Sequence, residues 1–251
     1  MTVLAQLIPA AEEGWLTLLE LGEDEIDTWL LIGGQMMYLL AAEHGTAMPR
    51  PTADLDVVVD VRARPGGTEW LARWLTERGF TMQGPSADGI GHKFVRHVSG
   101  GRGQVEFDVL GPEGLGERTP LFTVRPARTV QAPGTVQAFV RSEVVTVTVR
   151  TGGGQERTGR VRRPNVLGAL VAKAAATTIA VRENPERDWQ DAALLLTLVA
   201  DPMAASAECR KRDRQRLTLL TPLYDRAHPA WRGLGEDGWR AGTATLAFLT
   251  G

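Results

Sequence analysis

The chain has 251 residues, a formal net charge of −2, 43% hydrophobic residues and 23% charged residues. This length suffices for one large domain or two modest ones, and the composition excludes a disordered or fibrous protein. The small net charge excludes binding of nucleic acid through the field of the whole molecule, so such a partner would need a local basic patch. Cys209 is the single cysteine, which excludes an intrachain disulfide and a multi-cysteine zinc site.

The first half of the chain predicts alternating helices and strands. Apolar residues three and four positions apart indicate helices, and short runs of β-branched or apolar residues bounded by turn residues indicate strands. In chain order these are a helix within 11–27, a strand at 29–32, a helix at 35–43, a strand at 55–61, a helix at 69–78 and strands at 93–98 and 104–110. The last two strands flank a glycine-rich turn, so we expect a hairpin.

The second half changes character at Pro164. Before it, strands at 136–150 and 157–163 predict a second hairpin, and after it helices are predicted at 165–181, 187–200, within 203–225 and at 236–250. We therefore predict an α+β fold. Residues 1–135 would form a small mixed sheet with flanking helices, and residues 136–251 would hold the hairpin and a helical C-terminal domain.

The sequence predicts neither a secretory leader nor a membrane span. No basic, apolar and small-residue pattern follows Met1. The longest uncharged run, residues 28–42, is shorter than the roughly 20 residues that a span requires, and it contains two glycines. We therefore expect a cytoplasmic protein with no membrane partner.

Three acidic residues on two predicted strands are candidates for chemistry. Asp54 and Asp56 lie two residues apart at the start of a strand, so both carboxylates project from one face within reach of a shared ion. Asp108, with Glu106, lies on the polar face of a later strand. Carboxylates held this close repel unless a cation neutralises them, and oxygen ligands suit Mg²⁺. The alternative is that they are acids at a strand entry and on an exposed face.

A glycine pair precedes these acids. Gly33 and Gly34 end a predicted strand and open a helix, which presents bare backbone N–H groups to a phosphate. Taken alone, the pair is better explained by a tight turn that requires a positive φ.

Several basic residues are candidates for contact with phosphate. Lys173 is one of only three lysines, and it interrupts an apolar, alanine-rich helix. His92, Lys93 and Arg96 lie on or near the strand before Asp108, where a solvated strand edge is the alternative. A basic run offers contacts to an RNA backbone or a solvated helix face, and it consists of Arg210, Lys211, Arg212, Arg214 and Arg216.

Together these residues resemble the polymerase-β-like nucleotidyltransferase superfamily, whose pattern is Gly-Gly or Gly-Ser, a short helix, Asp-x-Asp on a strand and a third acid on a later strand. The segment Arg50-Pro51-Thr52-Ala53-Asp54-Leu55-Asp56 is similar to the AbiEii-type nucleotidyltransferase toxins, a group that includes the MenT toxins. Those proteins add a helical lysine and a short Asp-bearing helical motif. Lys173 and Arg187-Asp188-Trp189-Gln190-Asp191 match them here, Asp191 being the preferred acid.

The resemblance implies a catalytic set of residues and a nucleotide-binding set. The catalytic residues would be Asp54, Asp56, Asp108, Lys173 and Asp191, the first three of them binding one or two Mg²⁺ ions. A nucleoside triphosphate would be bound by Gly33, Gly34, Gln35, Thr52, Lys173 and Asp188. Residues 1–135 would then be the nucleotidyltransferase catalytic domain, and residues 136–251 would complete its cleft.

The resemblance also implies a reaction and partners. The chain would transfer a nucleoside monophosphate to the 3′ end of tRNA and release pyrophosphate, as the toxin of a type IV-like toxin–antitoxin system with a cognate antitoxin. The alternatives are transfer to a small molecule of the antibiotic type, transfer to a protein, or an inactive binding module of the same fold.

Overall fold

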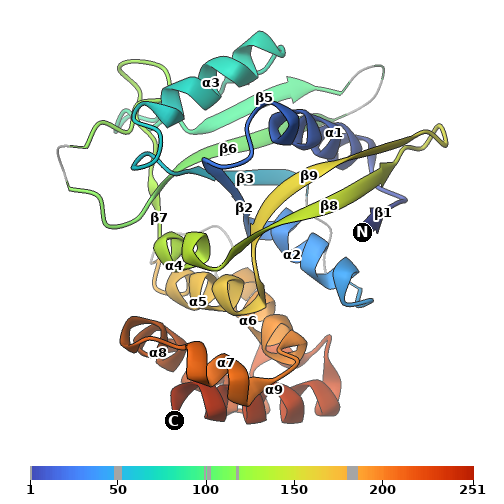
Figure 1. Ribbon diagram of the computed structural model, residues 1–251, viewed down its shortest axis with the longest axis vertical. Coiled ribbons are helices and arrows are strands. Elements are labelled where there is room, and N and C mark those ends of the chain that lie inside the picture. Colours follow the sequence, from blue (N-terminus) through green and yellow to red (C-terminus); the bar gives the residue numbers. More distant parts are fainter. Residues whose placement is uncertain (1, 48–52, 99, 101–102, 117–118, 180–185) are drawn as a thin grey trace. The chain divides into compact units, whose positions relative to one another are not determined.

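The computed structural model describes residues 2–47, 53–98, 100, 103–116, 119–179 and 186–251. The chain is a mixed α and β protein that divides into two compact units (Figure 1). The first unit comprises Met1–Ala132 and Ser142–Arg163, and the second comprises Pro133–Arg141 and Pro164–Gly251.

The first unit is built on a six-stranded mixed sheet in the order β2-β3-β6-β5-β4, with β7 paired to β6. The strands are β2 Trp29–Ile32, β3 Asp54–Val59, β4 Thr81–Met82, β5 Lys93–His97, β6 Gln104–Pro112 and β7 Gln131–Ala132. β3 and β6 run parallel, whereas β2–β3, β5–β6 and β4–β5 are antiparallel. The predicted β5–β6 hairpin is confirmed.

Two helices cover one face of this sheet (Figure 1). The helices of the first unit are α1 Pro9–Asp24, α2 Gly33–Glu43 and α3 Gly67–Glu77. Two glycines allow these helices to lie close to the sheet. A Cβ at Gly14 of α1 would lie 2.5 Å from Leu55, and a Cβ at Gly67 of α3 would lie 2.6 Å from Val59. Strand residues alternate between faces, so one set is fully buried under these helices. It consists of Leu55, Val57, Val59, Val105, Phe107 and Val109.

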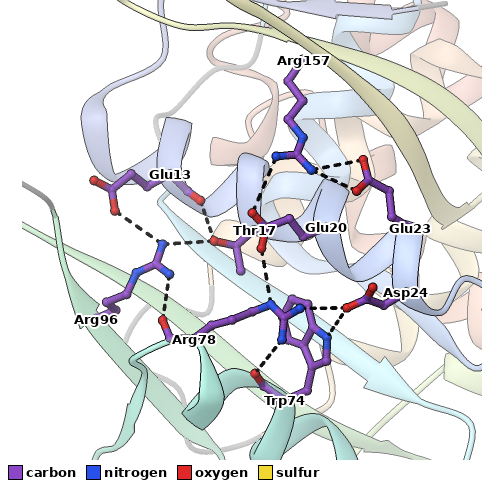
Figure 2. Close-up of polar contacts among 9 residues, drawn as sticks. All are labelled: Glu13, Thr17, Glu20, Glu23, Asp24, Trp74, Arg78, Arg96 and Arg157. Carbon is purple, nitrogen blue, oxygen red and sulfur yellow. Dashed lines mark hydrogen bonds and ion pairs between the residues drawn. The ribbon is translucent and has the colours of Figure 1, made fainter.

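A network of ion pairs and hydrogen bonds fixes α1 in place (Figure 2). Its members are Glu13, Thr17, Glu20, Glu23, Asp24, Trp74, Arg78, Arg96 and Arg157. Arg78, at the end of α3, lies 2.8 Å from Asp24 of α1. Arg96 of β5 donates a hydrogen bond to Thr17 at 3.2 Å. The side chain of Arg96 therefore lies on the helix-covered face, so the contact with phosphate considered for it is wrong.

A three-stranded sheet in the order β1-β8-β9 completes the first unit. Its strands are β1 Thr2–Leu4, β8 Ser142–Arg150 and β9 Glu156–Pro164. The β8–β9 hairpin was predicted as part of residues 136–251, but it belongs to the first unit. The physical reason is that β8 pairs in parallel with β1, and that Arg157 of β9 lies 3.0 Å from Glu23 of α1.

The described elements of the second unit are helices. They are α4 Thr135–Val140, α5 Val166–Ala176, α6 Glu186–Leu198, α7 Pro202–Glu208, α8 Lys211–Leu217, η1 Thr218–Tyr224, η2 Pro229–Trp231 and α9 Gly235–Thr250. The strand predicted from residue 136 is wrong over α4. Gly134 has a φ of +79° and turns the chain onto α5, so that Ala138 is buried there. This packing overrides the strand preference of the valine-rich segment.

The described parts of the chain contain no helix that is both long enough and apolar enough to cross a membrane.

Candidate functional site

Acidic side chains gather on the sheet face opposite α1 and α3. The parallel register of β3 and β6 places Asp54 beside Glu106 and Asp56 beside Asp108. Directly paired residues of neighbouring strands point to the same face, so these carboxylates form two adjacent rows. Asp54 is exposed and the other three are half-buried. The structure thus brings together on one face the three acids predicted from the sequence, and Glu106 shares this face, as alternation predicted.

The glycine turn lies directly against one of these carboxylates. Gly33 begins α2 immediately after β2 and has a φ of +68°, a conformation that favours glycine. A Cβ at Gly33 would lie 1.7 Å from Oδ2 of Asp56. The N-cap residue is Ile32, whose side chain cannot accept a hydrogen bond from the first turn. The N-terminal turn of α2 therefore lies directly beside the Asp56 carboxylate.

Asp108 is in an environment that disfavours its charge. Burial, followed by the neighbouring charge of Asp56, raises the pKa of Asp108 to about 8, although Lys93 acts in the opposite direction. Oδ1 of Asp108 is buried, and it has no hydrogen-bond partner among the residues that the structure describes. A carboxyl group in such a place keeps its proton at neutral pH unless a cation lies beside it.

Lys93 reaches the acids from β5. It pairs with Asp108 across the β5–β6 ladder, and its Nζ forms an ion pair with Oε1 of Glu106. Burial acts to lower the pKa of Lys93, but the hydrogen bond to Glu106 and the charge of Asp108 outweigh it and raise that pKa. The alternative of a solvated strand edge is wrong, because β5 lies between β6 and β4.

His92 lies next to the same row of acids. Its Nε2 is 4.0 Å from Oδ2 of Asp108. Burial, and then the charge of Lys93, lower the pKa of His92, which favours the neutral imidazole at neutral pH. His92 therefore adds a polar group to this face without adding a full positive charge.

The carboxylates are assembled on one face but are not gathered round one point. Among the described residues, no group of three or more His, Cys, Asp or Glu side chains is arranged so that it could hold a metal ion. The expectation that Asp54, Asp56 and Asp108 bind metal therefore rests on their shared face and register, and not on a preformed site.

The donor set nevertheless fits a hard cation in its chemistry and charge. Carboxylate oxygens are the ligands that Mg²⁺ prefers. A cation would also supply the partner that the buried Oδ1 of Asp108 lacks among the described residues, and it would favour the ionised form of this acid.

Gln35 does not present its side chain to the glycine turn. The side chain is 1% exposed, and its Oε1 accepts a hydrogen bond of 2.7 Å from Nε1 of Trp15. The expected role of Gln35 in nucleotide binding would therefore have to rest on its backbone. Gln35 instead joins α2 to α1, because a buried indole N–H requires an acceptor. Thr52, also predicted to bind nucleotide, lies outside the described residues.

Lys173, Asp188 and Asp191 form a buried cluster within the second unit. Nζ of Lys173 lies 3.2 Å from Oδ1 of Asp188 and 2.7 Å from Oδ2 of Asp191. The three residues are only 8%, 2% and 0% exposed. The two acids are three residues apart on α6 and so share one helix face towards α5. Lys173 is thus a buried ion-pair partner and not the solvated lysine of an alanine-rich helix.

The basic residues around α8 divide into two groups. Arg214 donates a hydrogen bond to the carbonyl oxygen of Leu249 at 3.1 Å, and Arg216 donates one to Gln137. Both therefore serve the packing of the second unit. The exposed members are Arg210, Lys211 and Arg212.

The ion pair between Lys93 and Glu106 was not expected from the sequence. The register of the β5–β6 hairpin could have indicated it, because this register pairs Lys93 with Asp108. Alternation already places Glu106 on the same face.

No protein-family model matches this chain, and no curated protein matches it.

Proposed function

We propose that the protein is a Mg²⁺-dependent nucleotidyltransferase, which transfers a nucleoside monophosphate from a nucleoside triphosphate to an acceptor hydroxyl. The observation that carries the proposal is the position of Gly33 against the Asp56 carboxylate, which is in register with Asp108 on the next strand. A backbone turn suited to phosphate thus opens beside acids suited to Mg²⁺. The nucleotidyltransferase core of the fold is part of the same proposal.

The acids would provide the electrostatic part of the reaction. The acceptor hydroxyl gives up its proton to water as its oxygen bonds to the α-phosphorus, the bond from this phosphorus to the α–β bridging oxygen breaks, and pyrophosphate leaves. Asp54, Asp56 and Asp108 are the proposed ligands of one or two Mg²⁺ ions, which when bound would offset the charge on the phosphate oxygens. The protein need form no covalent bond, so alignment and charge would account for most of the rate.

The nucleotide would be held by backbone groups and by a buried lysine. We propose that the first turn of α2, at Gly33 and Gly34, seats phosphates through its N–H groups. Lys173, with Asp188 and Asp191, is proposed for nucleotide binding on the basis of the family resemblance. In the structure its ammonium group is ion-paired with both of these acids within the second unit.

The proposed acceptor is the 3′ end of tRNA, and the proposed partner is an antitoxin protein. Both follow from the resemblance of residues 33–191 to the AbiEii-type toxins. Arg210, Lys211 and Arg212 support an RNA acceptor, because their side chains are exposed and can neutralise backbone phosphates.

A transfer assay tests this proposal. The purified full chain is incubated with Mg²⁺, tRNA and each of the four α-labelled nucleoside triphosphates in turn, and we expect labelled tRNA with one of them. The same assay is repeated with a protein or a small molecule of the antibiotic type in place of tRNA. Label on one of these would replace tRNA as the proposed acceptor and support the same class of reaction. The absence of labelled product with every nucleotide and acceptor would contradict the proposal. Growth arrest on expression in a host cell would support the toxin role.

Two acid substitutions serve as matched controls. Asp56→Asn should abolish labelled product and change the free energy of unfolding by less than ~1 kcal/mol, because this partly exposed acid packs little. Asp27→Asn alters an exposed acid elsewhere in the first unit and should keep full activity. Equal activity of the two variants would contradict the site assignment.

A further inference from the structure

Lys93 occupies the place where the acids would attract a cation. It lies opposite Asp108 in the β5–β6 ladder, and its Nζ forms an ion pair with Oε1 of Glu106. The charges of Asp108 and Asp54 also act on its ammonium group. One lysine side chain is therefore in the field of the same carboxylates that we propose as metal ligands.

The pairing differs from that of an ordinary surface lysine. β5 is an inner strand, and the side chains of Lys93 and Glu106 are 35% and 13% exposed. Charges in partly buried surroundings interact several times more strongly than in water, because the effective dielectric constant is lower. A change to either partner should therefore alter the potential at the neighbouring acids.

A divalent ion and Lys93 would compete for one region of negative charge. Asp54, Asp56, Glu106 and Asp108 face this side of the sheet in two adjacent rows. In the described part of the chain these acids are not arranged as a metal site, and one of them, Glu106, is ion-paired with Lys93. The ammonium group thus neutralises part of the charge that a metal ion would otherwise neutralise.

We propose that Lys93 is the built-in counter-ion of this acidic face: paired with Glu106, it positions the carboxylates before a divalent ion binds, and it sets the affinity of the site for that ion. The inference rests on the proposed function, because it takes Asp54, Asp56 and Asp108 as metal ligands. Lys93 is a positioning residue, which acts on the ion through the charge of its neighbours.

Titration of the full chain with MnCl₂, without nucleotide, tests this proposal. Lys93→Gln removes the positive charge, so Mn²⁺ should bind at least about tenfold more tightly. Glu106→Gln leaves the ammonium group without its partner, so Mn²⁺ should bind at least about tenfold more weakly. The double variant lacks both charges and should return towards the wild-type affinity, which makes a double-mutant cycle. Lys93→Arg keeps the charge and should resemble the wild type.

Arg157→Gln is the matched control. It removes an arginine that is ion-paired with Glu23, in the network of Figure 2, on the other side of the sheet from the acids. Its Mn²⁺ affinity should equal that of the wild type, because exposed charges are screened over such a separation. Unchanged affinity in Lys93→Gln, or shifts of the same sign in Lys93→Gln and Glu106→Gln, would overturn the proposal.

Two further outcomes keep the test decisive. If Lys93→Gln does not fold without metal, Glu106→Gln still has to weaken Mn²⁺ binding while Lys93→Arg retains it. If no variant and no wild-type protein binds Mn²⁺, the inference is wrong.

The test also separates this inference from the proposed function. If Lys93→Gln and Glu106→Gln shift the Mn²⁺ affinity in opposite directions but no nucleotide is transferred, the role of Lys93 is supported and the transferase proposal is contradicted. If the wild type transfers nucleotide and all variants bind Mn²⁺ with the same affinity, the transferase proposal is supported and the role of Lys93 is contradicted.

Discussion

At the scale of single residues, Gly33 has two reasons to be glycine. Its φ of +68° costs an L-residue roughly 1–2 kcal/mol. Its Cα hydrogen also faces the Asp56 carboxylate, where a methyl group would overlap Oδ2 at 1.7 Å. The first effect concerns stability and the second concerns the position of a proposed metal ligand, so comparison with a second positive-φ glycine that lacks such a neighbour can separate them.

Gly33→Ala should abolish nucleotide transfer because the added methyl group displaces the Asp56 carboxylate. Gly45→Ala is the matched control, since Gly45 has a φ of +65° and nothing lies within 4 Å of its added Cβ. In urea titrations Gly45→Ala should lose roughly 1–2 kcal/mol of unfolding free energy, and Gly33→Ala should lose at least as much. Activity should be lost in Gly33→Ala and kept in Gly45→Ala, and equal activity in the two would contradict the expected overlap.

Asp108 predicts a pH dependence of stability. Its pKa of about 8 in the folded protein is above the ordinary value of 3.8, so the folded state holds this proton more tightly than the unfolded chain does. Proton binding by Asp108 therefore contributes to the free energy of unfolding. This contribution is complete below the ordinary pKa and is lost as the pH rises through about 8. Asp108→Asn cannot ionise and should avoid this loss.

Urea unfolding at two pH values measures the effect. Asp108→Asn should exceed the wild type in unfolding free energy by on the order of a few kcal/mol at about pH 9, and by less at about pH 5. Added Mg²⁺ should stabilise the wild type at the higher pH and have little effect on the variant. An equal difference at both pH values would show that Asp108 ionises normally.

At the scale of elements, the ion pairs of Lys173 join α5 to α6. Lys173→Ala leaves the buried acids Asp188 and Asp191 without this cation, and loss of one partner from a buried ion pair costs about 3–5 kcal/mol. Urea unfolding of the full chain measures the change. The control is Arg187→Ala, an exposed position on α6, where a change within about 0.5 kcal/mol is expected. Similar values for both variants would contradict the structural role.

The residue pattern of each segment predicted the individual helices and strands better than it predicted which elements they pack against or pair with. The strand at 55–61 and the hairpin at 93–110 were readable because β-branched residues and a glycine turn act over a few residues. Helix α4 was misread because its burial depends on Ala172 of α5, whose Cα lies 2.4 Å from where a Cβ of Gly134 would be. The short strand β1 was missed because its stability comes from distant β8.

The same distinction applies to the site. Alternation predicted that Asp54 and Asp56 share a face, since this property is local. The contact of Gly33 with Asp56 and the side-by-side position of Asp108 depend on strand order and register, which local pattern does not contain. The burial of Gln35 could not be predicted for a related reason, because its side chain accepts a hydrogen bond from the indole N–H of Trp15, 20 residues away in the sequence.

At the scale of the molecule, the chain cannot be divided at residue 135 into two independent parts. A fragment of residues 1–135 lacks β8, the parallel partner of β1, and also lacks Arg157, which pairs with Glu23. A chain that joins Ala132 to Ser142 through a short flexible linker and ends at Arg163 retains both.

Thermal unfolding followed by circular dichroism compares these two chains. The joined chain should unfold cooperatively, and the 1–135 fragment should melt at least about 10 °C lower or show no transition. Equal melting temperatures would mean that the hairpin contributes nothing to the first unit and that the simpler boundary at residue 135 is adequate.

The interleaved order of the two units has a consequence for synthesis on the ribosome. The segment Pro133–Arg141 belongs to the second unit but is made before the hairpin that completes the first. Arg141 forms its ion pair of 2.7 Å with the buried Asp213, which is translated 72 residues later. At about 5–20 residues per second, Arg141 therefore waits roughly 4–14 seconds for its partner. During this interval Ala138 of α4, which is buried in the folded protein, lacks the later helices of the second unit that cover it.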